Sequence, residues 1–243
     1  MAKSNLLQVG LALCLALAAP FAWAQPAPAQ AAPAAPPSAQ AIPPAGQPAP
    51  LQLPELQFFV LPNGLRVYFM EKPGVPVADV RLWVRAGTAV EAPEQLGLAQ
   101  LVALLLERGA GARSDTAFQA ARDQLGVALS ASSGVEACKL ELYGHVRKLP
   151  QGLALMRDMV AAPRLDSATL ERVRKDQLRN IYRYTKYVGA MANEALKQLV
   201  MGFRHPMGRL PEGRVETLKS FTVAGVRAFH KKFYVPSNAA LVV

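Results

Sequence analysis

The sequence predicts an α+β domain in which a mostly antiparallel sheet carries helices packed on one face. Three observations favour this fold class. The predicted strands and helices occur in runs, whereas a parallel α/β fold would alternate them strictly. An Asn-Gly pair marks a tight hairpin at the start of the ordered region, and helical segments with cap residues follow it.

Turn chemistry and alternation identify the first strands. Residues 57–61 and 65–71 are largely apolar runs on either side of Pro62-Asn63-Gly64, where Asn-Gly is a strong hairpin signal. Within residues 77–85 alternate positions are apolar, and most of those between are polar or charged. This segment is expected to form a third, half-buried strand.

Caps and glycines set the predicted helix boundaries. Residues 94–108 are apolar nearly all round and stop at Gly109, which is typical of a deeply buried helix. Residues 114–126 begin at a Ser-Asp cap and end at Gly126. The remaining pattern predicts strands at 127–132, 135–146 and 238–243, helices at 149–160, 167–184, 189–201 and 222–233, and a loop at 203–213.

The N-terminal region has the composition of a secretory signal followed by a spacer. Residues 1–24 combine Lys3, an apolar run and a small-x-small ending, and the run is shorter than the roughly 20 residues that span a bilayer. Residues 25–50 are almost entirely Ala, Pro and Gln, a composition that cannot bury a core. We therefore expect an exported, periplasmic protein with no integral membrane segment after processing and an ordered domain at 51–243.

Charge and cysteine content exclude two further classes of function. The formal net charge of +10 falls to +9 when Lys3 leaves with the signal, but the basic residues are scattered and form no clustered face, so no nucleic-acid partner is expected. After processing, Cys138 is the only cysteine. It lies in mid-strand without a neighbouring histidine motif, which favours a packed thiol over a nucleophile.

Several segments together carry a family resemblance. They are LPNGLRV at 61–67, VRAGT at 84–88, LGLA at 96–99, LGVALSA at 125–131, HPMGR at 205–209 and FHKKFYVPSNA at 229–239. In order and spacing they resemble the N-terminal domain of the insulinase/pitrilysin zinc metallopeptidases, which include mitochondrial processing peptidases. The similarity covers about residues 56–243. Because the last strand ends the chain, we expect the domain to be truncated at its C-terminal end.

The catalytic signature implied by this resemblance is degenerate. Active family members carry His-x-x-Glu-His on a helix, where two histidines share a zinc ion and the glutamate accepts a proton from metal-bound water. Laid on this chain, the histidines fall on Gln100 and Leu104, the general base on Ala103, and a distant glutamate ligand on or next to Asn180. These groups are unsuited to zinc, so no zinc cofactor is expected.

Other residues were considered as replacement ligands. Glu107 shares a helical face with Gln100, and Glu194 lies on a later helix. The histidines are dispersed: they are His145, His205 and His230. We expect the histidines to be structural or surface residues and Glu107 to be a surface charge at a helix end.

These observations favour a catalytically inactive, zinc-less subunit of an exported heteromeric peptidase. The resemblance implies two similar halves around a chamber, with a zinc-bearing homologous subunit as partner and peptides as substrates. The chain would supply chamber wall and substrate contacts, although no substrate-binding residue can be named. Two alternatives stay open: an active zinc endopeptidase with displaced ligands, and a non-enzymatic binding or scaffold protein.

Overall fold

The predicted strands assemble into one six-stranded sheet in the computed structural model, which describes residues 54–243. The strands are β1 (Leu56–Val60), β2 (Arg66–Met70), β3 (Val77–Val84), β4 (Ala128–Ser133), β5 (Cys138–His145) and β6 (Ala239–Val242). Their order across the sheet is β1-β2-β6-β3-β5-β4. Only the β2–β6 pair is parallel, so the expectation of a mostly antiparallel sheet is confirmed.

The hairpin between β1 and β2 forms where the Asn-Gly pair predicts it. The Leu61 N–H donates to the Leu65 carbonyl (2.9 Å), and the Leu61 carbonyl accepts from the Gly64 N–H (2.8 Å). Gly64 has φ +85°, a conformation that side chains other than hydrogen disfavour. This turn fixes the register in which Phe59 pairs with Val67.

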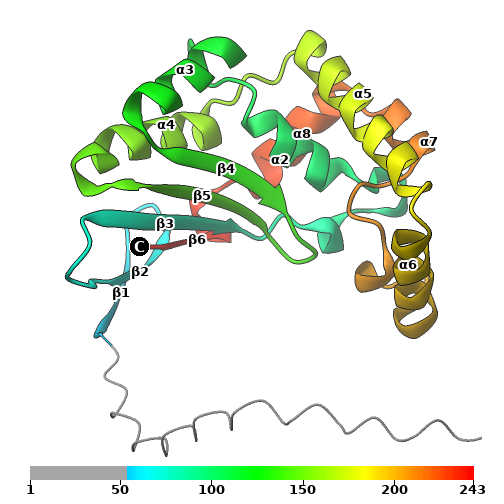
Figure 1. Cartoon of the computed structure of the whole chain (residues 1–243), viewed down its shortest axis with the longest axis horizontal. Coiled ribbons are helices and arrows are strands. Elements are labelled where there is room, and N and C mark those ends of the chain that lie inside the picture. Colours follow the sequence, from blue (N-terminus) through cyan, green and yellow to red (C-terminus); the bar gives the residue numbers. More distant parts are fainter. Residues whose placement is uncertain (1–53) are drawn as a thin grey trace, which may run out of the picture. The chain divides into compact units, whose positions relative to one another are not determined.

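Helices cover one face of the sheet (Figure 1). They are α2 (Leu98–Leu106), α3 (Asp115–Leu125), α4 (Leu149–Ala161), α5 (Ser167–Tyr184), α7 (Val215–Ser220) and α8 (Val223–Phe233). Helix α6 (Val188–Met201) stands apart from this layer and buries none of its residues (Figure 1). The main core lies between the sheet and the helices of this layer. It includes Val80 and Val84 from β3, Leu140 and Leu142 from β5, and most of α2. The α+β expectation with helices on one face is therefore confirmed.

The structure differs from the predicted elements at three places, two boundaries and one helix. The helix expected from residue 94 begins at Leu98, because Gly97 is left-handed (φ +92°) and a separate turn occupies Pro93–Gln95. The strand expected from residue 135 begins at Cys138, because the carbonyls of Val135 and Glu136 accept from the loop after β3 instead. Helix α7 was not predicted at all.

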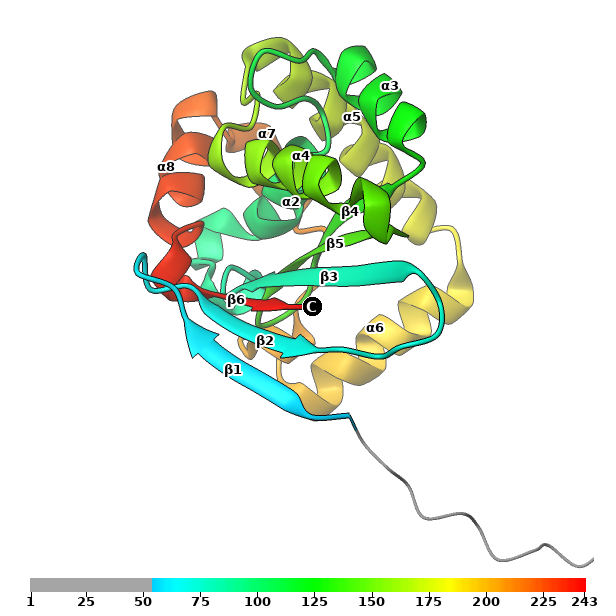
Figure 2. The same cartoon turned by 90° about the vertical axis from the view of Figure 1, so that its left-hand side faces the viewer.

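The other face of the sheet carries exposed side chains. In β3, Val77, Asp79, Arg81 and Trp83 are exposed, and Val80, Leu82 and Val84 are buried, as the alternation predicts. Figure 2 shows β6, which ends the chain, in the middle of the sheet between β2 and β3.

The predicted signal (1–24), the whole predicted spacer (25–50) and residues 51–53 lie outside the described residues. Within residues 54–243, no helix is both long enough and apolar enough to cross a membrane.

Candidate functional site

Helix α2, which carries most of the predicted catalytic positions, is anchored at its start by a buried carboxylate. Glu91 is only 5% exposed. Its two oxygens accept the N–H groups of Gly97 (3.1 Å) and Ala99 (2.7 Å), which the first turn of α2 leaves without helical partners. Glu91 therefore fixes where α2 begins.

The ionisation of Glu91 is poised near neutrality. Burial, the largest influence, raises the pKa of this carboxyl from 4.5 to about 7. The N–H groups of Ala99, Gly97 and Leu98 and the nearby Arg209 guanidinium act in the opposite direction and favour the carboxylate. The anchor of α2 thus carries a charge that changes within the physiological pH range.

Helix α5, which carries the distant ligand position, is tied to the same point. The Gln177 side-chain amide donates to the carbonyls of Glu212 (2.8 Å) and Gly97 (3.4 Å). Gln177 is 1% exposed and sits among apolar positions of α5. In the sequence, Gln177 interrupts the apolar stripe of this helix, and this polar interruption could have indicated a buried hydrogen-bonding role that was not predicted.

Helix α7 and the loop before it also contact the segment that begins α2. The Thr217 hydroxyl donates to the Leu96 carbonyl at 2.6 Å. Gly213, with φ +81°, approaches so closely that a Cβ there would lie 2.2 Å from the Leu96 oxygen. Together these contacts hold α2, α5 and the loop before α7 in one fixed arrangement, which we call the α2 junction: Glu91, Leu96, Gly97, Gln177, Glu212, Gly213 and Thr217.

The positions on α2 that the resemblance assigns to zinc chemistry carry little polar character. Gln100 is half-buried. Ala103 is fully buried at 0% exposure, and Leu104 packs against the core. A methyl group and an isobutyl group have no lone pairs, so α2 offers one neutral amide where the family signature needs two imidazoles and a carboxylate.

The fourth position, Asn180, lies on the exposed side of α5. Its Oδ1 accepts from Arg183 Nη2 at 2.6 Å, so the amide oxygen is already engaged by a cation. Among residues 54–243, no group of three His, Cys, Asp or Glu side chains is placed to hold a metal ion. The side chains at the three ligand positions, Gln100, Leu104 and Asn180, therefore do not fit zinc.

Each histidine ring forms a hydrogen bond with a backbone group. The Nδ1 atoms of His145 and His205 accept from the backbone N–H two residues ahead, at 3.1 and 3.2 Å. His230 lies on α8, where its Nε2 pairs with the Val160 carbonyl (2.8 Å) and its ring stacks on Tyr234. Burial lowers the pKa of His230. These contacts give all three histidines structural roles.

Glu107 is not the surface charge that we expected. It is partly buried, and its Oε1 accepts the Ala131 N–H of β4 at 2.6 Å. On the same strand, the Leu129 carbonyl accepts from Arg122 Nη1 at 2.5 Å. Since β4 ends the sheet on this side, Glu107 and Arg122 cover backbone groups that an edge strand would leave open.

Cys138 and Glu194 each have an environment that explains them without catalysis: Cys138 is buried, and Glu194 is bonded within its own helix. Cys138 is fully buried at the start of β5, and burial raises the pKa of its thiol to about 11, so it is a packed thiol as predicted. Glu194 lies on α6, where it accepts a hydrogen bond from Gln198 (2.9 Å).

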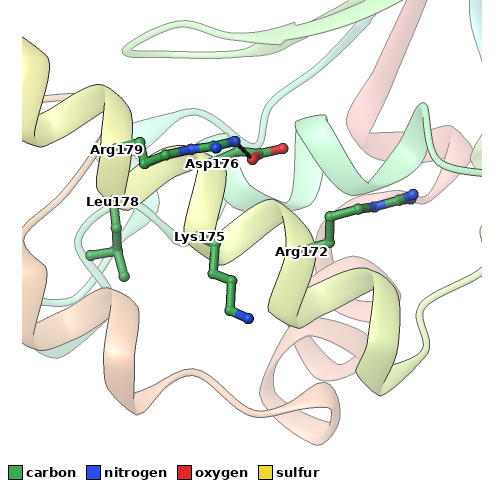
Figure 3. Close-up of a pocket in the computed structure, with 5 residues that line it drawn as sticks. All are labelled: Arg172, Lys175, Asp176, Leu178 and Arg179. Carbon is green, nitrogen blue, oxygen red and sulfur yellow. Dashed lines mark hydrogen bonds and ion pairs between the residues drawn. The ribbon is translucent and has the colours of Figure 1, made fainter.

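An open hollow of about 490 Å³ lies along α5 (Figure 3). Its lining residues are Arg172, Lys175, Asp176, Leu178 and Arg179. Two of its cations are already paired: Arg172 with Asp115 at 2.6 Å, and Arg179 with Asp176. The lining contains no histidine, cysteine or hydroxyl, so it offers neither a nucleophile nor a set of zinc ligands.

Comparison with known sequences places this arrangement in a family. The family model of insulinase, peptidase family M16, matches residues 66–206. An uncharacterized zinc protease of Mycobacterium tuberculosis is 31% identical over 182 residues, which are 73% of this chain and 40% of the relative. The mitochondrial-processing peptidase subunit beta of Rattus norvegicus is 26% identical over 179 residues, 71% of this chain and 35% of the relative. The chain thus spans about two fifths of the length of these relatives.

Solved structures share the fold. A peptidase M16 inactive domain from Pseudomonas fluorescens superposes with a TM-score of 0.73 at 24% identity, covering 77% of this chain and 46% of that one. The periplasmic protease PqqL from Escherichia coli gives a TM-score of 0.70 at 18% identity, covering 80% and 22%. With a family model that matches more than half of its residues, the chain belongs to the insulinase family of peptidases, family M16.

Proposed function

We propose that this chain is a zinc-less subunit of an exported, heteromeric M16 peptidase. It supplies wall surface and substrate contacts to a chamber, and a homologous subunit holds the zinc. The observation that carries this proposal is the chemistry of α2, where the fully buried Ala103 and the partly buried Leu104 stand at the positions of the general base and a zinc ligand. Metal-dependent hydrolysis needs both groups.

The contacts around α2 support a subunit that keeps its shape without its metal chemistry. In the α2 junction, Gln177 of α5 donates to the carbonyls of Gly97, at the start of α2, and of Glu212. Glu91 accepts two N–H groups from the start of α2, and Thr217 donates to the Leu96 carbonyl just before it. These two helices would carry the ligands in an active member. A domain that maintains this architecture can still present a shaped surface to a partner and to a peptide.

The open face of the sheet is the surface that we assign to the chamber wall. Trp83 is 41% exposed there and Tyr143 is 51% exposed on the neighbouring strand β5. Exposed aromatic rings on a rigid sheet provide contact area for apolar side chains of a peptide at low entropic cost.

Metal analysis of the purified chain tests the first half of the proposal. We expect much less than one zinc per chain after desalting, and a homologue with an intact His-x-x-Glu-His motif serves as the positive control. One zinc per chain, lost together with peptidase activity on chelation, would establish the alternative of an active enzyme with displaced ligands.

Co-expression tests the second half. The chain and a zinc-bearing homologue from the same source are purified together and assayed on peptides. We expect a complex whose activity neither chain has alone. If no such homologue is captured and the chain still binds other proteins, the scaffold alternative replaces the subunit proposal.

Export is part of the same proposal and rests on residues 1–50. Fused to a reporter that is active only outside the cytoplasm, these residues should direct secretion, with the mature N-terminus near Gln25. An intact Met1 on protein recovered from the cytoplasm would contradict the localisation.

A further inference from the structure

Strand β1 forms the second free edge of the sheet, and it differs from the β4 edge. Within residues 54–243, β1 pairs with β2 on one side and has no neighbour on the other (Figure 2). All five of its residues are exposed. Glu107 and Arg122 cover part of the β4 edge, but no side chain in the described part of the chain forms a hydrogen bond with the backbone of β1.

The hydrogen bonding of β2 determines which backbone groups of β1 face outward. On its β6 side, β2 uses the Met70 N–H and the Tyr68 carbonyl, which bond to Val243 at 2.9 and 2.8 Å. The alternate residues of β2, Val67 and Phe69, therefore bond to β1, where they pair with Phe59 and Gln57. The N–H and carbonyl groups of the other β1 residues point away from the sheet.

The outward series has defined ends. It consists of Leu56, Phe58 and Val60, and the next positions of the same parity are Pro54 and Pro62. Because proline has no N–H, it cannot extend a ladder of hydrogen bonds in either direction. The free edge is thus a short template with one donor and one acceptor on each outward residue.

The side chains of this edge are apolar and uncharged. Leu56 is 59% exposed, Phe58 55% and Val60 55%, and the Phe58 ring packs against Tyr68 with centroids 5.0 Å apart. The segment from Leu56 to Val60 contains no charged residue. Charged side chains, bulges and covering groups are the usual protection of a sheet edge, and β1 lacks them along this stretch.

We infer that β1 is a docking edge for β1 of a second copy of this chain, paired antiparallel about a two-fold axis at Phe58. In this register Phe58 faces Phe58 of the second copy, and Leu56 faces Val60. Each of the outward residues then exchanges both of its backbone groups, so every free donor of the edge finds an acceptor. The two sheets become continuous.

A second copy fits this edge because the strand complements itself. The antiparallel register sets the two Phe58 rings side by side and pairs leucine with valine, and it places no like charges opposite each other. The two prolines that end the outward series also match, because Pro54 of one copy lies opposite Pro62 of the other. A single-strand interface buries less area than a stable dimer needs, so the association is weak and depends on concentration.

Sedimentation equilibrium of the full chain tests this association between roughly 10 µM and roughly 1 mM, the range for weak complexes. Phe58→Lys brings two ammonium groups together at the axis, and the dimer dissociation constant should rise at least about tenfold. Phe59→Lys is the matched control: it adds the same charge on the same strand, but faces Gln57 of the second copy and should leave the constant within about threefold. A wild-type chain that stays monomeric throughout overturns the inference, as does equal weakening by both variants.

Cross-linking tests the register independently, in a Cys14→Ser background where Cys138 is buried. Residues directly opposite in a hydrogen-bonded pair have Cα atoms about 5.5 Å apart, within reach of a disulfide. Phe58→Cys should therefore oxidise to a covalent dimer, and Phe59→Cys should not, because its counterpart lies diagonally about 7–8 Å away. Phe58→Pro removes the ring and the outward N–H but no N–H that bonds to β2, and it should weaken the dimer. A dimer that resists Phe58→Pro and shows no Phe58 cross-link uses another surface.

Discussion

The charge of Glu91 should make the stability of the domain depend on pH in a direction opposite to most carboxylates. Burial raises its pKa in the folded chain from 4.5 to about 7. The folded state therefore holds the proton more tightly than the unfolded state does. The resulting stabilisation is complete below about pH 4.5 and is lost as the pH rises through 7.

The magnitude follows from the two pKa values. A difference of one pKa unit corresponds to about 1.4 kcal/mol, so the full effect is about 3 kcal/mol, of which about 2.5 kcal/mol falls between pH 5 and pH 8. Other groups titrate in this range, so the comparison needs a variant that lacks only this charge. Glu91→Gln keeps the shape of the side chain and is neutral at both pH values.

Urea unfolding of the wild type and of Glu91→Gln at pH 5 and pH 8 provides the measurement. The free energy of unfolding of the wild type, relative to the variant, should fall by roughly 2–3 kcal/mol from pH 5 to pH 8. If the wild type instead gains stability relative to the variant as the pH rises, the N–H groups of Gly97 and Ala99 outweigh burial. Glu91 would then be a fixed anion at the start of α2.

Three further predictions concern the α2 junction and the core. Gly213→Ala should destabilise the domain by more than about 3 kcal/mol, because its Cβ meets the Leu96 carbonyl, whereas Gly126→Ala has a similar φ but open space and should cost about 1–2 kcal/mol in urea unfolding. Gln177→Met should cost about 1–3 kcal/mol because it removes the hydrogen bonds to the Glu212 and Gly97 carbonyls, of which only the Gly97 carbonyl keeps another partner, the Leu101 N–H. The exposed Gln124→Met should change the same measurement by less than about 0.5 kcal/mol. In a Cys14→Ser background, the Cys138 thiol should react with a thiol reagent only after urea unfolding, and rapid reaction of the folded chain would contradict its burial.

Local signals were sufficient for much of the fold. The Asn-Gly turn fixed the first hairpin, and Ser114 and Gly126 bound α3 where their cap chemistry places them. Thr222 caps α8 through the Gly225 N–H in the same way. The alternation in β3 indicated correctly which face is buried. In each case the partner groups lie within a few residues, so the pattern is visible along the chain.

Features that depend on distant contacts could not be predicted. The start of α2 is set at Gly97, whose left-handed backbone lies against Gly213. Glu107 finds its partner on β4, and Gln177 joins two loops far apart in sequence. The resemblance indicated which positions to examine on α2 and α5, but not the α2 junction that holds these helices together.

The packing of α2 shows what Ala103 and Leu104 contribute to the fold. Helix α2 buries seven of its nine residues, and the two that are only partly buried, Gln100 and Leu104, stand at the positions that the resemblance assigns to the histidines. Ala103 lies within this core at 0% exposure, and Leu104 packs against it. A carboxylate at position 103 would enter an apolar, filled space at a cost of several kcal/mol unless it were paired. Ala103 and Leu104, which stand at the positions of the base and the second histidine, therefore help to hold α2 in the core.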